Sequence, residues 1–343
     1  MKIVKTEDAV GCIVAHDMTQ IIPGKYKGEP FKVGHVIQES DIPVLLSIGK
    51  EHVYVQESSD QEDDVEVHED AAAAFLYELA ADMHMHPTEV SAGRINAIAN
   101  VDGIFRTDTA RLFALNSLPD VTVSARHNYS IVHQGDMLFG ARVTPLSVPR
   151  TILEEATHVV GEAPICKIYP FKQKKVGIVT TGKEVYDGII EDGFAPVLRN
   201  KLAGYDYEEM GQVILPDEHE RTTKAILDFI DQGADIILVT GGMSVDPDDR
   251  TPLAIKNTGA QIITYGTPIF PGAMLMLAYL GNVAILGVPG GAVFSKRTTL
   301  DILLPRLMAD IKVSLDDINR LGNGGLCLLC KTCIFPNCGF GVE

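Results

Sequence analysis

The sequence predicts a three-layer α/β/α domain with a mostly parallel sheet over residues 167–320, preceded by a β-rich module and an α+β module. Three observations lead to this prediction. After Phe171, apolar strands alternate with helix-forming segments, the pattern of a parallel sheet covered on both faces. Three of these apolar segments end in glycine-containing turns. The first half of the chain instead contains short strand-like segments between glycine and proline turns.

The composition limits the classes of protein to which the chain can belong. Its 343 residues are 46% hydrophobic and 22% charged, which is ordinary for a globular protein with more than one domain. The formal net charge of −17 argues against long-range attraction to nucleic acid or to an anionic membrane. A small anionic ligand is compatible with this charge, because backbone amides at strand-to-helix turns bind phosphate. The N-terminus has no apolar signal core, so we expect a cytoplasmic protein.

The N-terminal half is expected to hold two modules. Residues 1–66 alternate apolar and polar residues between turns, which favours a small β-rich module. Residues 67–166 combine an alanine-rich helix at 71–83, which must stop before Pro87, with strand-like segments at 101–148. The acidic run 57–70 is interpreted as a solvated linker or the start of that helix.

The elements of the α/β domain follow in order. Strands are expected at 174–179, 210–215, 235–239 and 260–264, and helices at 193–203, 218–232, 253–257 and 293–308. The apolar run 272–294 has the length of a membrane span, but Gly281-Asn282 divides it and favours a β-hairpin. Right-handed crossovers would place the loops after the parallel strands along one edge of the sheet.

Three glycine turns form the candidate ligand site. They are TTGKE at 180–184, TGGMS at 240–244 and PGG at 289–291. Glycine lets a ligand approach the main chain, whose amides can then point at an anion. One such turn is equally well explained by tight turning, but three in one α/β unit favour a phosphate-bearing ligand. A P-loop at 177–183 is rejected, because Glu184 replaces the hydroxyl residue that would hold magnesium.

Carboxylates lie in the same loops. Asp217 follows the strand at 210–215, while Asp246, Asp248 and Asp249 follow the second turn, with Arg250 beside them. Acidic groups at a phosphate site are explained if a magnesium ion bridges them to the ligand. The alternative is that these aspartates cap helices and face water, which we prefer for Asp246 and Asp248.

The segment 174–310 resembles the molybdopterin-binding domain shared by molybdopterin molybdenumtransferases and molybdopterin adenylyltransferases. The motifs that carry the resemblance are TGKEV at 181–185, LPDE at 215–218, TGGMSVDPDD at 240–249 and GVPGGAVFS at 287–295. A nucleotide-acting domain of competence-damage proteins has similar motifs. The resemblance implies a three-layer α/β/α fold, a pterin-phosphate ligand and magnesium-dependent chemistry.

The resemblance also implies roles for individual residues. Asp217 and Asp249 would be catalytic and would hold Mg²⁺. The molybdopterin ligand would be bound by Thr181, Gly182, Glu184, Gly241, Gly242, Ser244, Arg250, Pro289, Gly290 and Gly291. The chain departs from the molybdenumtransferases at 270–274, where FPGAM replaces their lysine-containing K-P-G-K-P turn.

The function expected from the resemblance is a step of molybdenum cofactor biosynthesis. The chain would bind molybdopterin or its adenylate and aid Mg²⁺-dependent insertion of molybdate as a molybdenumtransferase-like enzyme. Two alternatives stay open, adenylation of molybdopterin and a non-catalytic carrier or sensor. The expected partners are molybdopterin, molybdate, ATP or AMP, a molybdoenzyme or another protein of the pathway, and further copies of the chain in a homo-oligomer.

The tail 321–343 is rich in glycine and cysteine. Its spacing, Cys327-x2-Cys330-x2-Cys333-x4-Cys338, is more typical of a metal site than of disulfides in a cytoplasmic protein. Four thiolates suit either Zn²⁺ or an iron–sulfur cluster. A redox-sensitive tail without metal is the alternative.

Overall fold

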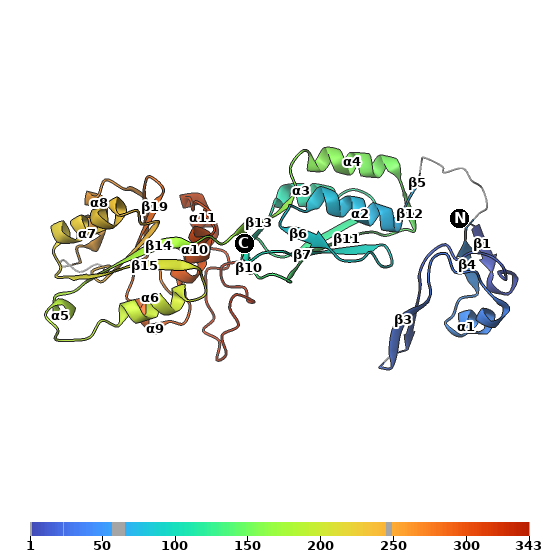
Figure 1. Ribbon diagram of the computed structural model, residues 1–343, viewed down its shortest axis with the longest axis horizontal. Coiled ribbons are helices and arrows are strands. Elements are labelled where there is room, and N and C mark those ends of the chain that lie inside the picture. The colour runs from blue at the N-terminus through green and yellow to red at the C-terminus, as the bar shows by residue number, and fades with distance from the viewer. Residues whose placement is uncertain (1, 23, 57–65, 245–248, 343) are drawn as a thin grey trace. The chain divides into compact units, whose positions relative to one another are not determined.

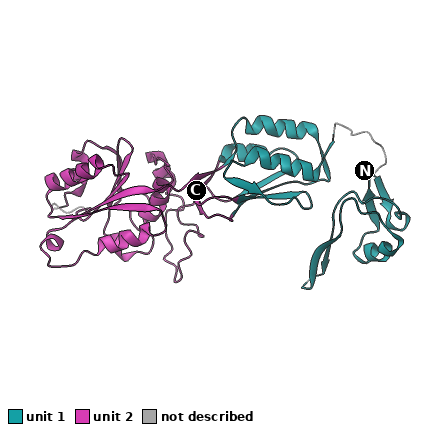
Figure 2. Cartoon of the chain, in the orientation of Figure 1, with its two compact units in different colours: residues 1–98, 108–125, 137–166 teal, residues 99–107, 126–136, 167–343 magenta. Residues whose placement is uncertain are grey.

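The computed structural model describes residues 2–22, 24–56, 66–244 and 249–342 (Figure 1). The chain divides into two compact units (Figure 2), the first comprising residues 1–98, 108–125 and 137–166 and the second residues 99–107, 126–136 and 167–343. No helix in the described ranges is both long and apolar enough to cross a membrane. The division into four parts at 66, 166 and 320 stays a prediction.

The first 56 residues are rich in short strands, as expected. β1 (Lys2–Lys5) pairs with β4 (His52–Val55), and β2 (Met18–Ile22) pairs with β3 (Tyr26–Phe31), both antiparallel. Two 3-10 turns, η1 (Thr6–Asp8) and η2 (Glu39–Asp41), and the short helix α1 (Ile42–Ser47) connect them. A small apolar core that includes Val14, Met18, Phe31 and Leu45 holds these elements together.

The rest of the first unit combines helices with an antiparallel sheet. The sheet order is β6 (Met85–Pro87), β7 (Arg94–Ala99), β11 (Met137–Val143) and β9 (Val121–Ala125), and β5 (Glu66–His68) pairs separately with β12 (Ser147–Pro149). The helices are α2 (Glu69–Ala80), α3 (Thr109–Leu115) and α4 (Arg150–Val160). Tyr77 of α2 stacks on Phe139 of β11 with ring centroids 5.9 Å apart, so the predicted alanine-rich helix covers this sheet.

The second unit contains the α/β domain. Its six-stranded sheet has the order β15 (Tyr207–Leu215), β14 (Lys174–Thr181), β16 (Ile236–Thr240), β19 (Val283–Val288), β18 (Met276–Leu280) and β17 (Gln261–Tyr265). The first four strands are parallel, while β18 is antiparallel to both of its neighbours. The mostly parallel sheet is therefore confirmed, and the apolar run 272–294 supplies the predicted hairpin.

Helices cover both faces of this sheet (Figure 1). One buried cluster joins the β14 residue Ile178 to α6 (Phe194–Leu202), α9 (Gly291–Phe294) and α10 (Thr299–Met308). The other joins its neighbour Val179 to α7 (His219–Asp231) and α8 (Thr251–Asn257). Because successive side chains of a strand point to opposite faces, these two clusters establish the three layers.

Three features of the second unit complete the architecture. A three-stranded sheet has the order β10 (Ser130–Val132), β8 (Gly103–Thr107) and β13 (Cys166–Pro170). Two short helices, α5 (Lys183–Tyr186) and α11 (Leu315–Arg320), were not expected. The single helix predicted at 293–308 is wrong, because α9 ends at Phe294 and a new helix begins after Thr298. Thr298 caps α10, with its amide donating to Asp301 Oδ2 at 2.7 Å.

Candidate ligand site at the carboxyl edge of the sheet

The three glycine turns lie at the ends of adjacent parallel strands. Thr180 of β14 pairs with Thr240 of β16, which pairs in turn with Val288 of β19. Neighbouring strands are about 4.8 Å apart, so the turns that follow them lie side by side along one edge of the sheet. The structure therefore brings the three predicted segments together.

The second turn is built from glycines that the fold itself requires. Gly241 and Gly242 have positive φ angles of 83° and 53°, a region that favours glycine. A Cβ atom on Gly241 would lie only 2.0 Å from the carbonyl oxygen of Thr181. The Thr251 hydroxyl donates to the Gly241 carbonyl at 2.8 Å and lies 3.3 Å from the Thr181 hydroxyl. The first and second turns are thus packed directly against each other.

The third turn has different properties. Pro289 is buried, and Gly290 precedes α9 with the ordinary helical angles φ −53° and ψ −27°. A Cβ atom on Gly290 or Gly291 would meet no atom within 4 Å. Neither backbone conformation nor packing therefore explains these two glycines, and they leave open space beside the main chain.

Asp217, which follows β15, holds the backbone of the first turn by a hydrogen bond. Its Oδ2 accepts a hydrogen bond from the amide of Lys183 at 2.9 Å, and the Gly182 amide donates to the Leu215 carbonyl at 3.1 Å. The Lys183 ammonium turns to Asp187 at 2.7 Å, which raises the pKa of Lys183. Glu184 is exposed. The Asp217 carboxylate therefore has a structural partner at the start of α5.

A polar network lies beneath the turns that the sequence did not predict. Gln212 Nε2 donates to Asp192 Oδ2 at 2.6 Å and to the Thr180 hydroxyl at 3.0 Å. Asp192 also accepts the Phe194 amide at 2.7 Å at the start of α6. The aspartate just before the predicted helix was a usable N-terminal signal, but no pattern linked it to Gln212, which lies on β15.

The end of the second turn contacts β17, which is the edge strand opposite β15. The Tyr265 hydroxyl of β17 donates to the Ser244 carbonyl at 3.1 Å. Burial, and secondarily the charge of Asp249, raise the pKa of Tyr265. Arg250 is exposed immediately before α8. Asp246 and Asp248 lie outside the described residues.

The residues proposed as Mg²⁺ ligands follow different strands of the sheet. Within the described ranges, no three His, Cys, Asp or Glu side chains form a group that could hold a metal ion. Asp217 follows β15, at one edge of the sheet, whereas Asp249 acts on Tyr265 at the opposite edge. Magnesium binding by this pair stays a prediction.

The cysteine tail packs against the segment that follows the third turn. Cys327, Cys330, Cys333 and Cys338 line one cavity of about 550 Å³ together with Arg297. Hydrogen bonds from the Phe335 amide and then from the Arg297 guanidinium lower the pKa of the Cys333 thiol. A metal at these cysteines also stays a prediction.

Two segments of the chain match known protein families. Residues 177–309 match the family described as "Probable molybdopterin binding domain". This segment contains the six-stranded sheet from the middle of β14 onward and all three turns. Residues 3–57 match a family described as "Domain of unknown function (DUF8806)".

Two of the similar curated proteins are molybdopterin molybdenumtransferases. The one from Synechococcus elongatus is 29% identical over 190 residues, which are 52% of this chain and 45% of that protein. The one from Haemophilus influenzae is 26% identical over 199 residues, which are 55% of this chain and 46% of that protein. The chain therefore matches less than half the length of either relative.

A solved structure with local similarity is the molybdopterin biosynthesis enzyme MoaB from Thermus thermophilus. It is 23% identical and covers 41% of this chain and 99% of its own, with a TM-score of 0.33. The sequence match coincides with the α/β domain, its hairpin and its three turns. Over residues 177–309, this chain is similar to the family of probable molybdopterin-binding domains.

Proposed function

We propose that this chain acts in molybdenum cofactor biosynthesis, and that it binds molybdopterin or its adenylate at the turns 180–184, 240–244 and 289–291. One observation carries the proposal. The family match includes the third turn. A Cβ atom added to Gly290 or Gly291 would have no protein atom within 4 Å, so there is open space beside the main chain of this turn. A ligand that approaches the main chain is a physical reason for glycine at such positions.

The chemistry of the turns suits a phosphate-bearing ligand. Backbone amides at strand-to-helix turns bind anions, and Arg250 adds an exposed cation beside the second turn. Asp217 and Asp249 supply carboxylate oxygens of the kind that Mg²⁺ prefers, and Mg²⁺ bound there would offset phosphate charge. Asp217 already accepts the Lys183 amide, so binding of the ligand by the turns is proposed independently of the metal.

One observation favours the carrier or sensor alternative over catalysis. The turn 270–274, which lacks the lysines of the molybdenumtransferases, is paired with the tail. The Phe270 amide donates to the Gly325 carbonyl and the Cys327 amide donates to the Phe270 carbonyl, both at 2.8 Å. This turn therefore supports the cysteine tail and provides no cation for molybdate or phosphate.

The three possibilities are separated by incubating the purified protein anaerobically with molybdopterin, Mg²⁺, and either ATP or molybdate. Molybdenum retained on the pterin would identify the insertion step, and formation of the adenylate would identify adenylation. Binding without turnover would identify a carrier or sensor. Failure to bind either molybdopterin or its adenylate would reject the proposal in all three forms.

A further inference from the structure

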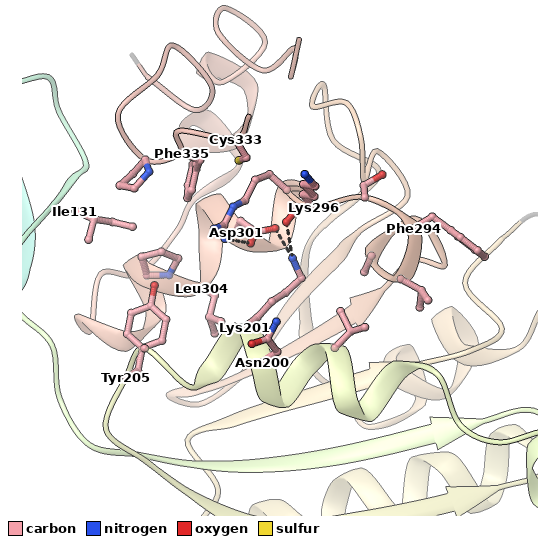
Figure 3. Close-up of a pocket in the computed structure, with 18 of the residues that line it drawn as sticks. Ile131, Asn200, Lys201, Tyr205, Phe294, Lys296, Asp301, Leu304, Cys333 and Phe335 are labelled. Carbon is pink, nitrogen blue, oxygen red and sulfur yellow. Dashed lines mark hydrogen bonds and ion pairs between the residues drawn. The ribbon is translucent and has the colours of Figure 1, made fainter. Parts of the chain in front are cut away.

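A second cavity lies within the same unit, between α6, α10 and the tail. Its volume is about 640 Å³, which is the size of a small-molecule pocket. Figure 3 shows side chains from α6, from the segment after the third turn and from the tail around it. Residues 292–295, which follow the third turn, line this cavity, but none of the residues of the three turns does.

The cavity contains an excess of positive charge. Lys201 Nζ lies 2.7 Å from Asp301 Oδ2 (Figure 3). Arg297 Nη1 lies 3.0 Å from Asp301 Oδ1. The side chains of Lys201 and Asp301 are only 8% and 3% exposed. Lys296 makes no salt bridge with any residue in the described ranges. Three cations thus face one carboxylate, although the chain as a whole carries a net charge of −17.

The other titratable groups that line the cavity are Cys333, whose thiol pKa is lowered by the Phe335 amide and by Arg297, His133 and Tyr205. Even with Cys333 as a thiolate, the three cations outnumber the negative groups of the lining. His133 lies at one side, with its Nδ1 3.1 Å from Asp102 Oδ2. The Asn200 amide and the Tyr205 hydroxyl add neutral polar groups. Tyr205 is partly buried, and the loss of solvent around its hydroxyl raises its pKa, so it is a neutral phenol near pH 7. A ligand that bears negative charge would therefore be favoured over a cation or a neutral molecule.

Aromatic rings form part of the wall. Phe335 lies 4.9 Å from the Arg297 guanidinium, measured to the ring centroid. Tyr205 meets Phe171 edge to face, with ring centroids 5.0 Å apart. Aromatic side chains beside cations suit a ligand that joins an oxyanion to a planar ring.

We propose that this cavity binds the oxyanion of a small ligand, either a phosphate ester or a metal oxyanion. Lys296 and Arg297 would contact the oxyanion directly. Lys201 is held by Asp301 and acts as a positioning residue that keeps the Arg297 and Asp301 side chains in place. Phe335 and Tyr205 would contact a ring attached to the oxyanion. This proposal goes beyond molybdopterin binding and requires neither the three turns nor magnesium.

The test uses the full chain and three probes, which are AMP, inorganic phosphate and molybdate. Binding is measured by calorimetry at low ionic strength, where charge contacts are least screened. Lys296→Gln removes the cation that has no salt bridge, and Lys296→Arg restores it. Lys331→Gln is the matched control, because Lys331 is an exposed lysine of the tail outside both cavities.

We expect at least one probe to bind. Its Kd should rise about tenfold in Lys296→Gln, the cost of losing one charged hydrogen bond. The affinity should recover in Lys296→Arg and stay unchanged in Lys331→Gln. Tighter binding of AMP than of phosphate would identify a phosphate ester with a ring as the ligand, whereas tighter binding of molybdate would identify a metal oxyanion.

Two results would overturn the proposal. One is that none of the probes binds to the wild-type chain. The other is that Lys296→Gln binds them as the wild type does, with an unchanged melting temperature showing that the variant is folded. Gly290→Ala keeps the cavity cations, so it should bind the probes normally even if molybdopterin binding at the turns fails.

Discussion

The second and third glycine turns end neighbouring strands, yet their glycines have different physical explanations. Gly241 combines a positive φ of 83° with a carbonyl oxygen only 2.0 Å from where its Cβ would lie. Gly290 has an ordinary helical φ of −53° and open space around it. The fold therefore accounts for glycine in the second turn and leaves it unexplained in the third.

This difference shows how a glycine motif can be divided into structural and ligand-related parts. A sequence pattern treats TGG and PGG alike, because both follow an apolar strand. The backbone angle and the space at Cβ separate them. The third turn is accordingly the stronger candidate for direct contact with a ligand, whereas the second turn is packed against the first through Thr251.

The largest expected effect concerns the buried ion pair between Lys201 of α6 and Asp301 of α10. Asp301→Asn keeps the shape of the side chain but leaves the buried Lys201 without its partner. Removal of one member of a buried pair costs about 3–5 kcal/mol, so urea unfolding should show a loss of that order. The control Asp316→Asn, at an exposed position in the first turn of α11, should change stability by less than about 0.5 kcal/mol. Equal stability of the two variants would contradict the importance of this pair.

Gly241→Ala tests the second turn. The added Cβ meets both an unfavourable backbone angle and the Thr181 carbonyl, so unfolding free energy should fall by more than about 2 kcal/mol. Gly259→Ala is the matched control, because Gly259 has a φ of 79° but no atom within 4 Å of an added Cβ. The difference between the two losses measures the close packing of the first and second turns. If Gly259→Ala were as costly as Gly241→Ala, that packing would have no energetic consequence.

Asp249→Asn tests the position and role of the carboxylate that ends the second loop. The negative charge of Asp249 disfavours the Tyr265 phenolate, so its removal should lower the pKa of Tyr265 while burial still holds that pKa above its usual value. NMR titration of labelled tyrosine rings, assigned with Tyr265→Phe, measures this shift. Magnesium-dependent turnover, where present, should fall although the fold survives. An unchanged tyrosine pKa together with unchanged turnover would show that Asp249 lies elsewhere and has no catalytic role.

The elements of the α/β domain were predictable because each is specified locally. Periodicity indicated the strands and helices, and Gly281-Asn282 indicated the hairpin between β18 and β19. The convergence of the turns followed from the carboxyl ends of parallel strands meeting at one edge. The break between α9 and α10 was missed, although residues 295–299 are all polar and Thr298 and Asp301 form a capping box that could have indicated a new helix start.

The side-chain contacts of the site were less predictable for a different reason. Gln212 meets Asp192, and Asp217 meets the Lys183 amide, only after strands and loops from separate segments are assembled. Lys201 likewise reaches Asp301 across 100 positions of the chain. Such contacts depend on strand order and register, which a single sequence does not specify.

The most direct test of the central claim is the affinity for molybdopterin of the wild type and of Gly290→Ala, measured anaerobically. The account predicts at least tenfold weaker binding in the variant, with stability within about 0.5 kcal/mol of the wild type. Gly339→Ala, in which the added Cβ also meets no atom within 4 Å, should bind as the wild type does. Equal affinity of wild type and Gly290→Ala, or no binding to the wild type, would contradict the account.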